Sequence, residues 1–251
     1  MQKIGFQESI LKFHTLKIDP SPPENMYDHL LILAAAVGTI AGLDVLNLTL
    51  IKTHRWFWLH LLVNFIVAGC ALPDLIWTLQ WNPILSLGGA WIPRTLIPKG
   101  FTLILHIYHI IMFRDLQLID WVHHIVMCSI LILVFYTDPA IRITNTVMFF
   151  VNGLPGGLDY LMLLLVKRGS MHPLTEKYYN SLINAWLRAP GILFGIFCGY
   201  FNWRTGFIHC PSWVTMSVII ALFWNAQYFS HRVAVNYGWS RYKNEENRSE
   251  L

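Results

Sequence analysis

Long apolar stretches, separated by short polar ones, make up most of the chain. A helix needs about 20 predominantly apolar residues to cross the hydrocarbon layer of a bilayer. Seven stretches meet or approach this length, and the third is short enough for a tilted or partly re-entrant helix. We expect a membrane-spanning helix over each of these ranges: 29–51, 57–80, 100–114, 117–137, 140–167, 180–202 and 213–236.

The composition supports a membrane protein and excludes other classes. Of the 251 residues, 55% are hydrophobic and 13% are charged, whereas a soluble domain is typically about 25% charged. No run of basic residues marks a nucleic-acid surface, so we expect no nucleic-acid partner. The four cysteines form no Cys-x-x-Cys pair, which argues against a structural zinc knuckle. These features predict an all-α polytopic membrane protein.

The chain divides into three parts by composition. An N-terminal segment at the membrane interface (1–27) precedes one transmembrane domain (28–237), and a polar C-terminal tail (238–251) follows. Seven spans would place the two ends of the chain on opposite sides of the membrane. More Lys and Arg residues fall in the loops on the side of the C terminus, so the positive-inside rule predicts a cytosolic C terminus.

Charged side chains interrupt the apolar stretches. Each costs about 2.5–3.5 kcal/mol at the middle of a bilayer, so we expect them to face a polar interior, pair with a neighbour or lie near helix ends. Lone Asn and His residues in the spans more often link helices by hydrogen bonds. Together they predict about seven helices around a polar cavity. The charged residues are Asp44, Asp74, Asp120, Asp159 and Arg188.

The span at 117–137 carries an acid followed by two histidines. Asp120 precedes His123 by three residues and His124 by four, and this spacing places a carboxylate and an imidazole on one helix face. A carboxylate bonded to one ring nitrogen fixes the tautomer and makes the other nitrogen a stronger base. The pattern indicates a general base. The alternative is that Asp120 only caps its helix.

The span at 140–167 contains a helix-breaking sequence. Three glycines and Pro155 fall within Asn152–Gly157, and Asp159 follows. Proline removes a backbone donor and glycine weakens a helix, so we expect an irregular helix between Asn152 and Gly157. Backbone groups freed inside a membrane usually line a cavity. The alternative is a structural kink, with Asp159 directed at a polar neighbour.

Histidines in two spans raise the possibility of a metal centre. Membrane di-iron enzymes use several histidine boxes, whereas His106, His109, His123 and His124 are four residues in two partial boxes. This number is low for two iron ions, and we expect no metal.

Four motifs, in this order and spacing, resemble the TLC-domain superfamily, which includes the ceramide synthases. The resemblance covers roughly residues 50–236. The motifs are the pair His123-His124 that opens a span, Arg142-Ile143 with the interrupted segment ending at Lys167, the stretch from Tyr179 to Phe194 containing Arg188, and Trp224-Asn225-Ala226-Gln227-Tyr228-Phe229.

The chain also departs from that family. Asn152-Gly153 stands where ceramide synthases carry a His-Asp pair, and Ile125 follows the paired histidines. We therefore expect a divergent member. The segment 105–109 is similar to the histidine box of fatty-acid elongases, which has another His where Ile110 stands.

The resemblance implies transfer of an acyl group from acyl-CoA, as co-substrate, to a lipid amine or hydroxyl in the endoplasmic reticulum. Membrane lipids are the expected partners, and a homodimer is possible. We expect His123 or His124 to act as general base or as a nucleophile, Asp120 to orient it, and Asp159 to hold the acceptor. A basic rim of Arg114, Lys167 and Arg168 would attract the CoA phosphates. The expected substrate-binding residues are Asn152, His109, Arg188 and Asn225.

Two other functions are compatible with the sequence. The same cavity would serve a non-catalytic protein that binds a lipid or a cargo and regulates membrane composition. A metal-dependent membrane oxidoreductase is the third candidate. A co-purified acyl-CoA would favour the transferase, a phospholipid or sterol alone the binding protein, and bound iron or zinc the oxidoreductase.

Overall fold

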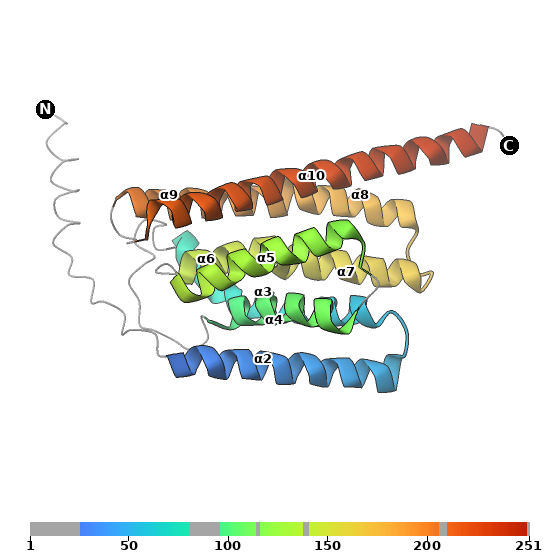
Figure 1. The fold of residues 1–251 in the computed structure, drawn as a ribbon. Helices are drawn as coiled ribbons and strands as arrows, with labels where there is room; N and C mark the ends of the chain where they lie inside the picture. Colours follow the sequence, from blue (N-terminus) through green and yellow to red (C-terminus); the bar gives the residue numbers. More distant parts are fainter. Residues whose placement is uncertain (1–25, 81–95, 114–115, 138–140, 206–209, 250–251) are drawn as a thin grey trace, which may run out of the picture.

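The computed structural model describes residues 26–80, 96–113, 116–137, 141–205 and 210–249 (Figure 1). Within them the chain forms seven helical rods, at the positions of the seven predicted spans, and no strand. The rods are α2 (Met26–Leu46) with a π-helical turn (Asn47–Ile51), α3 (Arg55–Gln80), α4 (Ile97–Met112), α5 (Leu118–Thr137), α6 (Ile141–Met148) joined through a π-helical turn (Phe149–Gly153) to α7 (Leu154–Lys167), α8 (Pro173–Ile183) joined through a π-helical turn (Asn184–Arg188) to α9 (Ala189–Arg204), and α10 (Ser212–Ser249).

The predicted all-α membrane fold is confirmed. Four rods have the length and apolar composition to cross a membrane: Met26–Ile51, Arg55–Leu79, Ile143–Lys167 and Pro173–Arg204. Two shorter helices, Ile97–Met112 and Trp121–Leu133, are also apolar. The protein is therefore an integral membrane protein. The predicted N-terminal interfacial segment lies almost wholly outside the described residues, and most of the polar tail continues α10 as a helix.

The rods lie side by side and alternate in direction (Figure 1). α3 packs against α4, α6 and α7, whereas α4 packs against α2, α3 and α5. On the far side of the bundle from α2, α10 packs against α8 and α9. α4 has 16 residues, or about 24 Å of helix, which is shorter than the roughly 30 Å hydrocarbon core. Most of its residues are buried by the surrounding helices.

Glycines allow the helices to approach closely at two places. A Cβ atom on Gly191 would overlap the ring of Phe150, and one on Gly195 would overlap the side chain of Val147. The two glycines are four residues apart and lie on one face of α9, which rests on α6 and the π-helical turn after it. Small residues at this spacing let membrane helices pack backbone to backbone.

The predicted interruption of the helix at 140–167 is present, but it lies earlier than expected. The π-helical turn covers Phe149–Gly153, so it includes Asn152 and Gly153. Leu154 through Gly157 is α-helical because Pro155 falls in the first turn of α7, where its missing N–H is tolerated.

Acids and amides within the bundle are bonded to polar groups on neighbouring helices. Asp44 of α2 pairs through both carboxylate oxygens with Arg55 of α3, and the hydroxyl of Tyr108 on α4 donates to it at 2.5 Å. Asp74 of α3 accepts a hydrogen bond from Nδ2 of Asn145 on α6 at 2.7 Å. For Asp44 and Asp74, this agrees with the expectation that charged groups in the spans have polar partners.

Candidate functional site

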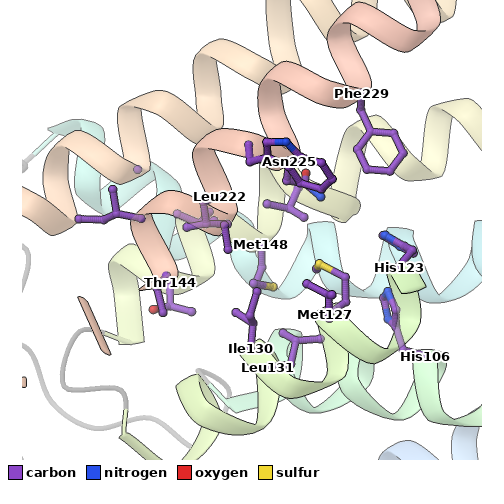
Figure 2. A pocket seen from close by; sticks show the side chains of 18 of the residues that line it. His106, His123, Met127, Ile130, Leu131, Thr144, Met148, Leu222, Asn225 and Phe229 are labelled. Carbon is purple, nitrogen blue, oxygen red and sulfur yellow. The ribbon is translucent and has the colours of Figure 1, made fainter. Parts of the chain in front are cut away.

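A cavity of about 600 Å³ lies inside the bundle, bounded by α5, α6, α9 and α10. Its walls are mostly apolar, and Figure 2 shows the histidines at one end with the apolar side chains beyond them. The apolar lining includes Met127, Ile130, Leu131, Val147, Met148, Val151, Ile196, Val218, Ile219 and Leu222. Such a chamber suits a hydrocarbon chain.

Five histidines from three helices gather at one end of this cavity. His106 and His109 are three residues apart on α4, which places them on one face. Adjacent residues on α5 supply His123 and His124, and α3 supplies His60. The ring centroid of His124 lies 5.2 Å from that of His106 and 4.5 Å from that of His109. The connection from α4 to α5 is short and antiparallel, so it brings the two pairs together.

Three of these histidines form a tighter group. His106, His123 and His124 each offer a ring nitrogen, and the three nitrogens lie within 4.8 Å of one another. His106 and His124 are buried, and His123 is half-buried. Among the residues that the structure describes, this is the group of His, Cys, Asp or Glu side chains close enough to share a metal ion.

The ring of His106 is held in one orientation and one tautomer. Its Nδ1 lies 2.8 Å from the carbonyl oxygen of Thr102, one turn earlier in α4. A carbonyl only accepts, so Nδ1 carries the proton and Nε2 keeps its lone pair. The hydroxyl of Thr102 accepts in turn from Nδ2 of Asn152 at 2.9 Å. Asn152, predicted to bind substrate, therefore supports the turn of α4 that positions His106.

Aromatic rings fix the neighbouring histidines. The indole of Trp56 stacks on His109 and contacts the edge of His60. The ring of Tyr160 lies 4.4 Å from that of His60. Trp56, Tyr160 and Thr102 are not among the residues predicted from the sequence. For two of them, the spacing from the histidines indicates such contacts, because residues four apart lie on one helix face. Trp56 precedes His60 by four residues, and Thr102 precedes His106 by four.

A cation and an amide stand beside the cavity. The guanidinium of Arg188 donates from Nη2 to Oδ1 of Asn225 at 2.6 Å and lies 4.9 Å from the ring centre of Phe229. The ring of Phe229 lies 5.7 Å from that of His123. Since Oδ1 of Asn225 accepts from Arg188, its Nδ2 is left to donate to a ligand. Asn225 lines the cavity, whereas Arg188 acts from behind it.

Neither of the two acids predicted for the site, Asp120 and Asp159, is shown in contact with the histidines. Oδ1 of Asp159 accepts a hydrogen bond from Nδ2 of Asn180 at 2.7 Å, which links α7 to α8. Asp159 is not among the residues that line the cavity, although its neighbour Tyr160 is. This placement corresponds to the alternative of a polar neighbour. Asp120 lies in the first turn of α5, and its side chain is outside the described residues.

The cavity reaches the surface between α5 and α10. Val122 and Val126 of α5 and Trp224 of α10 line it, yet they are 48%, 45% and 61% exposed. The opening therefore lies on the side of the bundle, between two helices, and is called the lateral opening below.

Basic residues stand at the end of the bundle nearest the histidines. Lys167 lies over the ring of Phe57, and Arg168 lies 4.9 Å from the ring centre of Trp58. Both cations are exposed, and both rings belong to the first turn of α3. Arg232, which is not among the predicted site residues, lines the cavity. Arg114, the third predicted member of the rim, lies outside the described residues.

The fold and this site define a class: an all-α integral membrane protein whose apolar cavity ends in a cluster of histidines. Comparison of the chain with models of known protein families, with curated proteins and with solved structures finds no match. The resemblance to the TLC-domain superfamily stays a prediction from the motifs.

Proposed function

We propose that the protein transfers a fatty acyl group from acyl-CoA to a lipid amine or hydroxyl. The acyl chain would occupy the apolar cavity, and the reaction would take place at the histidine cluster. The observation that carries this proposal is the continuity of the chamber: one end is apolar, the other holds the imidazoles, and basic side chains lie beyond them.

The cavity is long enough to hold one extended lipid tail. Its lining on α10 runs from Val214 to Arg232, a rise of about 27 Å along a helix. The hydrocarbon core of a bilayer is about 30 Å thick and holds two tails end to end. His106 lies six residues before the end of α4, which is about 9 Å below the helix ends. A thioester at that depth remains within reach of the flexible arm of a CoA bound at the surface.

The site contains groups for each part of an acyl transfer. The histidine cluster takes the proton from the acceptor amine or hydroxyl, which attacks the thioester carbonyl. The carbon–sulfur bond then breaks, and the CoA thiolate leaves and takes up a proton. Nδ2 of Asn225, with the charge of Arg188 behind it, stabilises the oxygen that becomes negative during the attack. Asp159 has no part in this scheme, because its carboxylate is bonded to Asn180.

Release of free CoA by the purified protein tests this proposal. The protein is incubated with acyl-CoA and a panel of sphingoid bases and lysolipids. We expect release with at least one acceptor, and loss of it in His124→Ala. Disabling the proton transfer typically costs about 10²–10⁴-fold. His29→Ala, which removes a buried imidazole of α2 outside the cavity lining, serves as the matched control.

A non-catalytic lipid-binding protein is the second candidate. The lateral opening favours it, because a bound lipid could exchange with the bilayer without any reaction. In that case no acyl-CoA would release CoA above the His124→Ala background, and the variant would change only the affinity for lipid.

A further inference from the structure

We propose that His106, His123 and His124 together bind one divalent transition-metal ion, Zn²⁺ by ligand type, with its fourth position open to the cavity. The binding site stands on the geometry of the three imidazoles. The role given to the ion below rests on the proposed acyl transfer.

The spacing of the imidazoles is close to that of a metal site. Their ligand nitrogens lie within 4.8 Å of one another. Zinc–nitrogen bonds of about 2.0–2.1 Å place two tetrahedral ligands roughly 3.4 Å apart. The rings therefore need to move inward by about 1 Å, which small side-chain rotations provide.

The hydrogen bond at His106 is an independent sign of a metal ligand. Metal-binding histidines almost always donate the N–H of the other ring nitrogen to a carbonyl or carboxylate, which fixes the tautomer. Nδ1 of His106 donates to the carbonyl of Thr102 in this way, and Nε2 is left with its lone pair. The amide of Asn152 holds the hydroxyl of Thr102, so two helices stabilise this turn.

The number and charge of the ligands define the kind of site. No metal is expected from the sequence, because four histidines are too few for two iron ions. A single catalytic zinc needs only three protein ligands and an open position. Three neutral imidazoles leave the charge of the ion uncompensated, and the described acids Asp44 and Asp159 are bonded elsewhere. Such an ion favours an anionic group at the open position.

This arrangement supplies the proton transfer that acyl transfer needs. The ion stabilises the negative charge on an acceptor hydroxyl as it loses its proton. His109 takes that proton, because its ring lies 4.5 Å from that of His124 and its Nδ1 has no hydrogen-bond partner among the described residues. The acceptor oxygen bonds to the acyl carbon, the carbon–sulfur bond breaks, and the departing CoA thiolate receives the proton from His109.

Metal analysis of the purified full-length protein tests the site without any activity assay. The protein, free of a polyhistidine tag, is analysed as purified and after incubation with excess Zn²⁺ and removal of unbound ions. We expect about one ion per chain. Single variants His106→Gln, His123→Gln and His124→Gln should each retain less than about one tenth of it. His60→Gln, which changes a buried histidine outside the group of three, is the matched control and should retain the ion.

Cobalt substitution keeps the test decisive if a variant fails to fold. Co²⁺ bound to the wild-type chain by three nitrogens in a four-coordinate site gives strong visible absorption, whereas adventitious Co²⁺ remains weakly coloured. Absence of both zinc uptake and this absorption would overturn the proposal. So would equal metal content in the three ligand variants and in His60→Gln.

Activity separates this inference from the proposed function. One bound ion without CoA release upholds the metal site and overturns the acyl transfer. CoA release that survives complete removal of the ion by a chelator overturns the role of the metal and leaves the acyl transfer standing.

Discussion

Nε of Arg188 donates a hydrogen bond at 2.9 Å to the carbonyl oxygen of Val151, a residue of the π-helical turn between α6 and α7. In a regular helix this carbonyl would accept from the N–H four residues later. That residue is Pro155, which has no N–H. The guanidinium therefore gives a side-chain donor to a carbonyl that has no α-helical donor, and the same side chain donates to the amide oxygen of Asn225.

Arg188→Met should destabilise the protein. It removes the side-chain donor to the carbonyl of Val151 and the donor to Oδ1 of Asn225, and a buried polar group that loses its partner costs about 1–3 kcal/mol. Thermal unfolding in detergent measures this as a lower midpoint. Arg204→Met, at the exposed end of α9, is the control and should unfold like the wild type. Equal midpoints for the two variants would contradict a structural role for Arg188.

Asp44 and Arg55 should show energetic coupling. Asp44 is 1% exposed, and its carboxylate accepts from both Arg55 and Tyr108. Removing one partner of a buried pair costs about 3–5 kcal/mol, because the other charge stays buried. The double variant Asp44→Asn, Arg55→Met should therefore lose less stability than the sum of the single variants, as measured by unfolding in mixed micelles. Strict additivity would show that the pair is not coupled.

Gly191→Ala and Gly195→Ala should each weaken the packing of α9. The added Cβ atoms overlap Phe150 and Val147, respectively. Overpacking of this kind costs about 1–3 kcal/mol. Gly38→Ala lies on an exposed face of α2, and no atom lies within 4 Å of the new Cβ. It therefore tests only the difference in helix propensity between Gly and Ala. It should be neutral or slightly stabilising, and a loss as large as at Gly191 would refute the close approach.

A large side chain within the cavity should displace its ligand. Met127→Trp fills part of the chamber, whereas Ile125→Trp on the same helix adds the same bulk at a position that is 56% exposed and outside the lining. Mass spectrometry of the purified proteins should find less co-purified lipid in the first variant than in the second. Equal lipid content would argue against the cavity as the binding site.

Asn225→Ala should slow acyl transfer by about 10²-fold, since loss of one donor to the developing oxyanion typically costs 10²–10³-fold. CoA release at saturating acyl-CoA measures kcat. Asn202→Ala removes a buried amide whose Nδ2 bonds to the carbonyl of Cys198 within α9, and it is the control. A fall in affinity for acyl-CoA without a fall in kcat would assign Asn225 to binding alone.

The positions of the helices could be predicted from the sequence, because the length of an apolar stretch is a local property. The sequence also indicated that the helix at 140–167 is irregular, since Pro155 and its glycines act on their own helix, but it placed the irregularity over Asn152–Gly157. The π-helical turn lies a few residues before the proline because Pro155 itself is accommodated in the first turn of α7.

The candidate site could be predicted less well, because it depends on which faces of different helices pack together. His106 and His123 lie in different spans, and their spacing along the chain does not reveal that their rings are 5.7 Å apart. The same limit applies to Asp159. Its position in an interrupted span indicates a polar environment, but only the packing of α7 against α8 places its carboxylate on Asn180.

The exposed side chains where the cavity opens, Val122, Val126 and Trp224, have a consequence for how the proposed lipid would enter. Under the proposed function, a lipid that enters between α5 and α10 would remain in hydrocarbon, so its binding would not include the cost of crossing water. Occupancy then follows the mole fraction of that lipid in the surrounding bilayer rather than its concentration in the aqueous phase. Titrations of this protein are therefore meaningful in bilayers of defined composition, where diluting the sample with buffer leaves occupancy unchanged and diluting the ligand with other lipids lowers it.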